Sequence, residues 1–77
     1  MPRYFFHIRD TGKTILDQQG IELDDLDEVR EKATQGARQI MREQARLGRP
    51  QDDQSFVVTD EQGQTVLTFP FKLVIRD

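Results

Sequence analysis

The sequence predicts an α+β fold with the element order ββαββ: a four-stranded antiparallel sheet with one long amphipathic helix packed on one face. Two observations predict this class. Segments with alternating apolar side chains occur as two pairs, and a short turn that contains glycine joins the members of each pair. Between the pairs, apolar residues from Leu26 to Leu47 recur at steps of three and four, which is the spacing of one helix face. The whole chain, 1–77, is expected to form one compact domain.

The first pair of strands is expected at the start of the chain. In residues 3–9, successive side chains point to opposite faces of a strand. One face carries Tyr4, Phe6 and Ile8, and the other carries Phe5, His7 and Arg9. Residues 10–13 form a turn signal, because their glycine can adopt a positive φ. The chain should return as a second strand over 14–17, which residues 21–23 extend.

The helix has clear signals at both ends. Asp24 or Asp25 can act as the N-cap, and the acidic residues that follow favour the positive end of the helix dipole. The helix should end at Gly48, because Pro50 cannot continue it. A glycine in mid-helix costs about 1 kcal/mol relative to alanine, so Gly36 on the apolar stripe predicts a close approach to the sheet. The stripe consists of Leu26, Val29, Ala33, Gly36, Ala37, Ile40 and Leu47, with Met41 on its flank.

The second pair of strands follows the helix. Residues 55–60 predict the third strand, 61–63 a turn, and 64–69 the fourth strand. Pro70 cannot donate a hydrogen bond to a neighbouring strand, so it should lie on an edge or at a strand end. The tail over 71–75 is too apolar for a disordered terminus, and it should pack on the domain or on a neighbour.

Composition limits the classes of protein that fit. The net charge of −3 argues against a general polyanion binder. The chain has no cysteine, so no disulfide can stabilise this small domain, and the composition suits a reducing compartment. Its start lacks the apolar core of a signal peptide, and no apolar run is long enough to cross a membrane. We therefore expect a cytoplasmic protein without membrane association.

A second apolar face predicts self-association. One helix can cover only one face of the sheet, yet the predicted strands carry apolar side chains on both faces. A large apolar patch on a monomer usually marks an interface. We therefore predict a homodimer that forms through the open sheet face or an edge strand, with an unidentified protein partner as the alternative. The residues assigned to this interface are Phe5, His7, Val57 and Val66.

The single histidine raises the question of catalysis. A catalytic histidine needs a nucleophile, an orienting carboxylate and an oxyanion site, but the chain has one serine and no cysteine. His7 also lies in mid-strand, whereas catalytic residues are commoner on loops. We therefore predict a structural or interfacial histidine, no catalytic residues and no enzyme. An enzyme would require a cleft built around His7 and Arg9 by dimerisation.

Neither a metal nor a cofactor is expected. Zinc sites use cysteine and histidine, and one histidine is not enough. The acidic residues at 24–28 lack the ligand spacing and central glycine of a calcium loop, and helix capping accounts for them. Residues 12–14 (GKT) resemble the end of a phosphate-binding loop, but the earlier glycine is missing and no helix is predicted to follow.

The strongest charged feature lies on the helix. Residues 1–29 carry a net charge of −4, residues 30–49 of +4, and residues 50–77 of −3. Four arginines at steps of four, four and three line the side of the helix opposite the apolar stripe. Such a ridge can contact phosphates, although cations near a helix C-terminus also favour the dipole. The alternative function is therefore nucleic-acid binding through Arg38, Arg42, Arg46 and Arg49.

Three segments together resemble a known family. They are PRYFFHIRD at 2–10, LDQQGIEL at 16–23 and DEQGQTVLTFPF at 60–71. Over nearly the full chain they resemble a family of short bacterial proteins catalogued as a domain of unknown function. The resemblance implies a small stand-alone bacterial protein without an assigned activity or known ligand residues. The leading hypothesis is a non-enzymatic protein-interaction or regulatory module that acts as a homo-oligomer.

Overall fold

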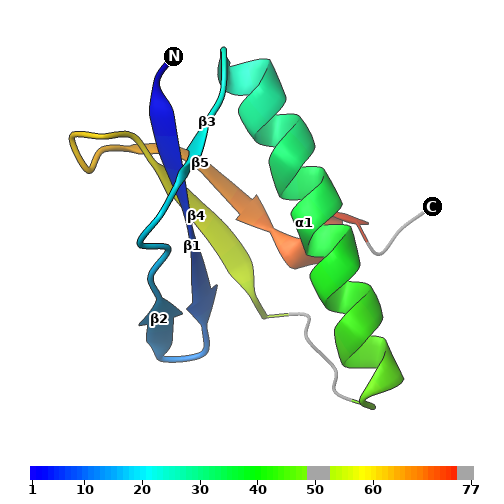
Figure 1. Ribbon diagram of the computed structural model, residues 1–77. Coiled ribbons are helices and arrows are strands. Elements are labelled where there is room, and N and C mark those ends of the chain that lie inside the picture. Colours follow the sequence, from blue (N-terminus) through cyan, green and yellow to red (C-terminus); the bar gives the residue numbers. More distant parts are fainter. Residues whose placement is uncertain (49–52, 75–77) are drawn as a thin grey trace.

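The computed structural model describes residues 1–48 and 53–74, in which one long helix lies along one face of an antiparallel sheet (Figure 1). The α+β class and the place of the helix between two pairs of strands are confirmed. The second predicted strand differs, because it is divided into two short strands. The elements are β1 (Arg3–Asp10), β2 (Lys13–Ile15), β3 (Ile21–Glu22), α1 (Leu26–Arg46), β4 (Ser55–Thr59), β5 (Thr65–Pro70) and the 3₁₀ helix η1 (Phe71–Val74).

The strand order is β2-β1-β4-β5, and β3 pairs with β1 as well. All of these pairs are antiparallel. Residues directly opposite each other in an antiparallel pair share a face. His7 is paired with Val57, and Ile8 is paired with Ile15, so these two pairs lie on opposite faces of the sheet. Pro70 ends β5 at an edge of the sheet, as predicted.

The core lies between α1, the sheet and η1. Phe71 is fully buried, its amide donates to the Gln54 carbonyl oxygen at 2.9 Å, and its ring meets the edge of Phe56 with centroids 4.8 Å apart. The prediction that the apolar tail packs on the domain is therefore confirmed at Phe71. The buried apolar residues are Tyr4, Leu23, Val29, Ala33, Ala37, Phe56, Val58, Phe69 and Phe71.

The predicted helix signals are confirmed at both ends. Asp25 is the N-cap, and its carboxylate accepts a hydrogen bond from the Glu28 amide at 3.0 Å. Gly48 follows the helix with a φ of +73°, which L-residues with side chains rarely adopt. Gly36 approaches the sheet as expected, because a Cβ atom there would lie 3.2 Å from Cζ of Phe56. The smallest residue on the stripe thus lets α1 approach the ring.

The apolar stripe is buried only in its middle. Leu26 and Leu47 were expected on the buried stripe, but they are 49% and 56% exposed. The buried residues of α1 are Val29, Ala33 and Ala37, all in its first half and middle. The first turn and the C-cap of α1 therefore contribute little to the core.

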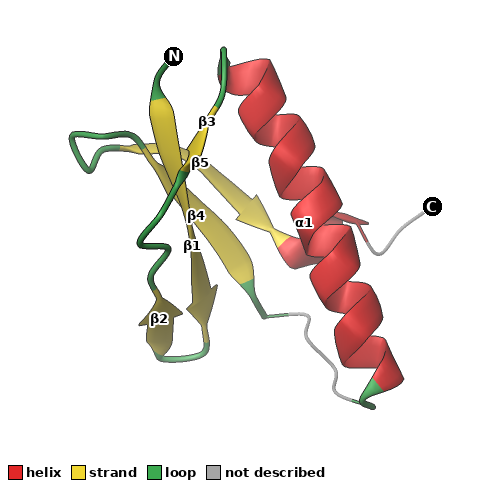
Figure 2. Cartoon of the chain, in the orientation of Figure 1, coloured by secondary structure: helices red, strands yellow, loops and turns green. Residues whose placement is uncertain are grey.

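The helix lies off the centre of the sheet. It packs mainly against η1 and β5, at one edge of the sheet, whereas β2 and β3 lie at the opposite edge (Figure 2). Ile15 and Ile21 are paired with Ile8 and Tyr4, which places them on the helix side of the sheet. They remain 51% and 39% exposed. The helix side of β1, β2 and β3 is therefore only partly covered.

Candidate functional site

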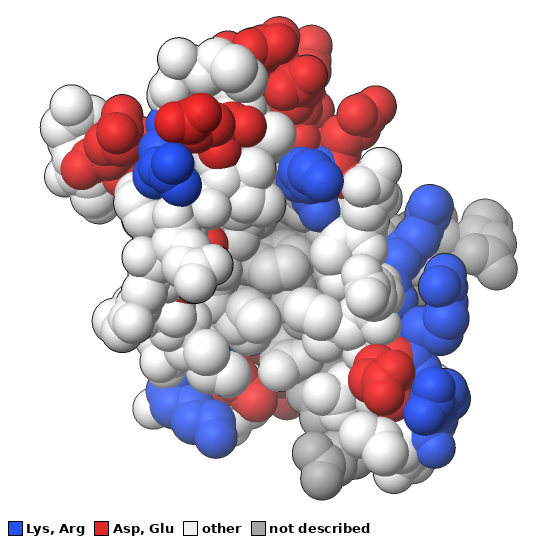
Figure 3. All heavy atoms as spheres, in the orientation of Figure 1, with Lys and Arg blue, Asp and Glu red and all other residues white. Residues whose placement is uncertain are grey.

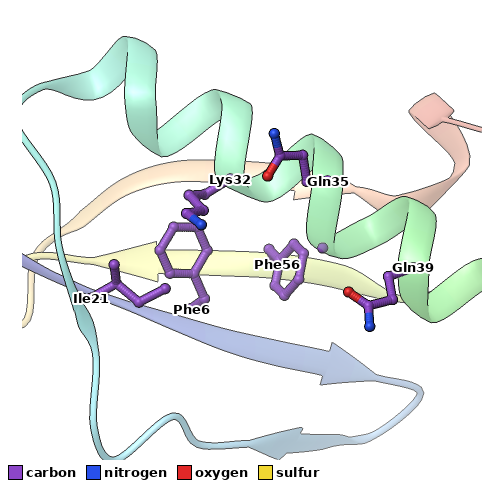
Figure 4. Close-up of a pocket in the computed structure, with 7 residues that line it drawn as sticks. Phe6, Ile21, Lys32, Gln35, Gln39 and Phe56 are labelled. Atoms are coloured by element: carbon purple, nitrogen blue, oxygen red, sulfur yellow. The ribbon is translucent and has the colours of Figure 1, made fainter.

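An apolar groove opens where the helix leaves the sheet uncovered, and its volume is about 230 Å³. Phe6 from β1 and Phe56 from β4 form its floor, and Ile21 from β3 closes one side (Figure 4). The helix supplies the opposite wall. The wall residues are Lys32, Gln35, Gly36 and Gln39. Figure 3 shows the surface hollowed between α1 and the β2–β3 side. We call this hollow the helix–sheet groove.

Local packing explains why the floor of the groove is aromatic and accessible. The rings of Phe6 and Phe56 meet edge to face, with centroids 5.7 Å apart and an angle of 87° between the planes. Gly36 lacks a side chain that would cover the Phe56 ring from above. Phe6 is only partly buried, and the exposed Ile21 borders it. The groove is therefore built by three strands and one helix, and its accessible apolar surface comes mainly from Phe6 and Ile21.

A second hollow of about 270 Å³ continues along α1 toward its N-terminus. It is lined by Leu23, Glu28, Glu31, Lys32 and Gln35. Because both hollows include Lys32 and Gln35, they adjoin each other along the helix. Acidic side chains gather around this end of the molecule (Figure 3). Residues 22–31 contain six acidic residues and one basic residue. We call the second hollow the acidic hollow.

None of the predicted interface residues lines the groove. Phe5, His7 and Val57 are partly buried on the face opposite α1, and the rings of Phe5 and His7 stack with centroids 6.3 Å apart. Val66 was expected on the same face, but it packs against the core. The pairing of β4 with β5 is irregular between Val58 and Thr59, and this irregularity takes Val66 out of the regular alternation.

Both ring nitrogens of His7 are used within the fold. The Asp17 amide donates to Nδ1 at 3.1 Å, and Nε2 lies 3.1 Å from the Thr59 hydroxyl oxygen. An amide N–H can only donate, so Nδ1 is the acceptor, and the proton of the neutral ring is on Nε2. Nε2 therefore donates to Thr59. The histidine joins β1 both to β4 and to the connection between β2 and β3.

Asp17 organises that connection, which sequence reasoning had treated as the end of a strand. Its carboxylate accepts hydrogen bonds from the amides of Phe6 at 3.1 Å, Gln19 at 3.1 Å and Gly20 at 3.2 Å. Burial acts to raise the pKa of Asp17, but these amide hydrogen bonds and the proximity of His7 together lower the pKa below its usual value of 3.8. An aspartate followed at the third position by glycine is a turn signal that could have revealed this role.

Gly20 completes this turn for steric reasons. Its φ is +73°, and a Cβ atom there would lie 2.9 Å from the Tyr4 carbonyl oxygen and from the side chains of Arg3 and Phe5. A larger residue would push β3 away from β1. The turn thus holds Ile21, the next residue, at the side of the groove.

The arginine ridge is present in the described part of the chain. Arg38, Arg42 and Arg46 are exposed, and basic side chains follow the outer side of α1 (Figure 3). Arg46 lies 3.8 Å from the Glu43 carboxylate. Arg49, the fourth member, lies outside the described residues. The ridge is on the side of the helix that faces away from the sheet, so it is separate from the groove floor.

Two further findings concern the described residues only. Within 1–48 and 53–74, no three acidic or histidine side chains come together as a set that could hold a metal ion. Among these residues, no helix is both long enough and apolar enough to cross a membrane.

Comparison with known proteins places the chain in a family. Residues 3–72 match the family described as "Domain of unknown function (DUF6894)". No curated protein and no solved structure matches the chain. The match covers β1 to β5 and part of η1, and so includes both walls of the groove. The resemblance seen in the sequence is thus confirmed, and the chain belongs to the DUF6894 family, whose function is unknown.

Proposed function

We propose that this chain is a protein-interaction module without catalytic activity of its own, and that it docks a short segment of a partner protein in the helix–sheet groove. The observation that carries the proposal is the apolar groove in which the exposed Ile21 and the partly buried Phe6 adjoin the buried Phe56 ring, beside a helix wall that carries two glutamine amides. An exposed apolar surface bordered by polar side chains is typical of a protein-binding site.

The size of the groove supports a peptide segment over a small molecule. A small-molecule pocket usually encloses its ligand in one volume of about 300–1,000 Å³, whereas here two hollows of about 230 and 270 Å³ follow each other along α1. That space suits one or two side chains of a longer chain. The acidic hollow extends it along α1, so the partner can continue past the apolar part. Peptide segments bind in this way to grooves bordered by helices and strands.

The surroundings of the groove also favour binding over chemistry. His7 lies on the other face of the sheet, and both of its nitrogens have partners. The groove itself presents aromatic rings, an isoleucine, two glutamines and one lysine. Catalysis usually needs a nucleophile or an acid–base pair next to the bound group. These features support a module that recognises a partner and leaves it chemically unchanged.

Substitution of one groove residue tests the proposal. The immobilised chain is used to select from a library of random nonapeptides, and the affinity of an enriched peptide is measured by fluorescence polarisation. We expect Ile21→Asp to lower this affinity at least tenfold, because binding would bury a charge without a partner. Leu47→Asp is the matched control: Leu47 is a similarly exposed aliphatic residue outside the groove, and its substitution should leave the affinity unchanged.

Two results would contradict the proposed function. The library could yield no enriched peptide, or the Ile21→Asp variant could bind the enriched peptide as well as the original chain does. Urea denaturation of both variants shows that they are folded in the binding assay. Because Ile21 is already 39% exposed, we expect its substitution to change stability little.

We further propose that the module acts as a homodimer through the sheet face that carries Phe5, His7 and Val57. Support comes from the partly buried aromatic and aliphatic side chains there, on the face that α1 does not cover. A stable dimer usually buries about 800 Å² on each protomer, and the chain has 5559 Å² of accessible surface. About one seventh of the surface would be needed.

The mass in solution tests the homodimer. Light scattering on a sizing column should give twice the chain mass of 9.0 kDa at both low and moderate salt. Val57→Glu should convert the dimer to a monomer by placing a charge in the interface. A monomer at both salt concentrations would contradict the dimer, but it would leave the groove proposal intact because the groove is on the other face.

Nucleic-acid binding, bacterial origin and a cytoplasmic location stay predictions.

A further inference from the structure

We infer that the segment bound in the helix–sheet groove is an extended peptide with an apolar side chain over Phe6 and Phe56 and a basic side chain two residues away in the acidic hollow. The inference rests on the proposed function and adds the chemistry of the partner to it. Three features of the groove carry the inference: the spacing of two glutamines, the order of the two hollows, and the charge around one end.

The glutamines match the repeat of an extended chain. Gln35 and Gln39 are exposed, stand one helical turn apart and both line the groove (Figure 4). Four residues of helix rise about 6 Å, and two residues of extended chain advance about 6.6–6.8 Å. A glutamine amide both donates and accepts hydrogen bonds, so each can pair with the N–H and C=O of one peptide residue. Residues two apart in the peptide would then face the two glutamines.

The two hollows match alternate side chains of the same peptide. The apolar part, over Phe6 and Phe56, adjoins the acidic hollow at Lys32 and Gln35. In an extended chain, side chains two residues apart point the same way. One can enter the apolar groove while the other enters the neighbouring hollow. From Glu28 to Gln39 the helix rises about 16 Å, a length that about five extended residues span.

The charge around the acidic hollow selects the second side chain. Glu28 and Glu31 line it, and residues 22–31 carry a net charge of −5 from six acidic residues and one basic residue. A lysine or arginine of the partner would be attracted to this end. Lys32 stands between the two hollows and reaches toward Phe6 (Figure 4), so an acidic residue of the partner would find only one cation there.

A helical partner fits these features less well. An amphipathic helix docks through several apolar anchors at steps of three and four along one groove. Here the apolar floor is followed by a hollow with two carboxylates, so a second apolar anchor would displace their hydration without compensation. The backbone of a helix also has its N–H and C=O groups paired internally, so it cannot use Gln35 and Gln39.

The sequences of the enriched nonapeptides are the first test. We expect an apolar residue paired with lysine or arginine two positions away, without apolar repeats at steps of three and four. In the best peptide, N-methylation at the apolar residue or at the basic residue removes an N–H that faces the helix, and should weaken binding at least fivefold. N-methylation at the residue between them is the control, since that N–H points away from the helix, and should weaken binding much less.

Substitutions on the helix are the second test. Gln39→Met keeps the length of the side chain but removes its donor and acceptor, and should lower the affinity about threefold to tenfold. Gln62→Met, in the turn between β4 and β5, should leave it unchanged. Glu31→Gln should weaken a lysine-bearing peptide but not its counterpart with norleucine at that position.

The outcomes separate this inference from the proposed function. Apolar residues at helical spacing in the enriched peptides would overturn the extended partner but keep the groove as a docking site. Equal affinity of the Gln39→Met variant and of the N-methylated peptides would do the same. An absence of enriched peptides, or full binding by Ile21→Asp, would overturn both.

Discussion

Phe71→Ala is expected to lower the free energy of unfolding by about 3–5 kcal/mol, because it removes a fully buried ring from the core. A chain of this length typically has a total stability of roughly 4–12 kcal/mol, so the variant should be at the limit of folding. Phe71 follows the last strand, and its ring closes the space between α1 and Phe56. Urea denaturation followed by circular dichroism measures the change.

Leu73→Ala is the control for this substitution. Leu73 belongs to the same 3₁₀ helix but is 58% exposed, so its removal should change the free energy of unfolding by no more than about 0.5 kcal/mol. The comparison separates burial of the ring from any effect of η1 itself. If Phe71→Ala cost no more than about 0.5 kcal/mol, as an ordinary surface change does, then the Phe71 ring would not complete the core.

Asp17→Asn is expected to lower the free energy of unfolding by about 2 kcal/mol at neutral pH, because hydrogen bonds to a charged acceptor are lost. Oδ2 of Asp17 accepts from the Phe6 amide, and Oδ1 accepts from the amides of Gln19 and Gly20. An asparagine has one oxygen, so its NH₂ group would face a backbone N–H donor on one side. The turn that holds β3 against β1 would loosen.

The same substitution should change how stability depends on pH. The pKa of Asp17 is lower in the folded chain than its usual value of 3.8, so its contribution is fully present above that value and is lost as the pH falls through the folded pKa. The difference in stability between the original chain and Asp17→Asn should therefore shrink as the pH falls below about 4. Urea midpoints between pH 2.5 and 6.5 measure it.

The control for the pH effect is Asp53→Asn, which replaces an exposed aspartate. This variant should follow the acid sensitivity of the original chain over the whole pH range. If Asp17→Asn and Asp53→Asn lost stability in acid by the same amount, the three amide hydrogen bonds would not stabilise the charged form of Asp17.

The interpretation of His7 shows what sequence reasoning could reach and where it stopped. The position of His7 in mid-strand and the lack of a suitable nucleophile predicted a non-catalytic residue. Its actual partners, the Asp17 amide and the Thr59 hydroxyl, are 10 and 52 residues away along the chain. Such contacts depend on how β1 pairs with β4 and on the path between β2 and β3. No local pattern contains that information.

The groove is the part of the site that sequence reasoning missed. The sequence showed two apolar faces on the strands and placed the accessible one opposite the helix. The structure adds an accessible region on the helix side, because α1 packs toward β5 and η1 instead of over the middle of the sheet. Exposed glutamines on a helix are ordinary, so the sequence does not distinguish Gln35 and Gln39 from other surface residues. Their spacing of four residues, which places them on the same side of the helix, is the one pattern that could have indicated them.

Local signals in the sequence are sufficient to predict several of the elements. The Asp25 cap, the stop at Gly48 and the alternation in β1 and β4 are each written in a few neighbouring residues, because backbone dihedral preferences and hydrogen-bond caps act over short distances. The position of α1 on the sheet, in contrast, depends on contacts between segments that are distant in the sequence. That position follows from the combined volumes of Phe56, Phe71 and Gly36, which come from three separate elements and meet only in the folded chain.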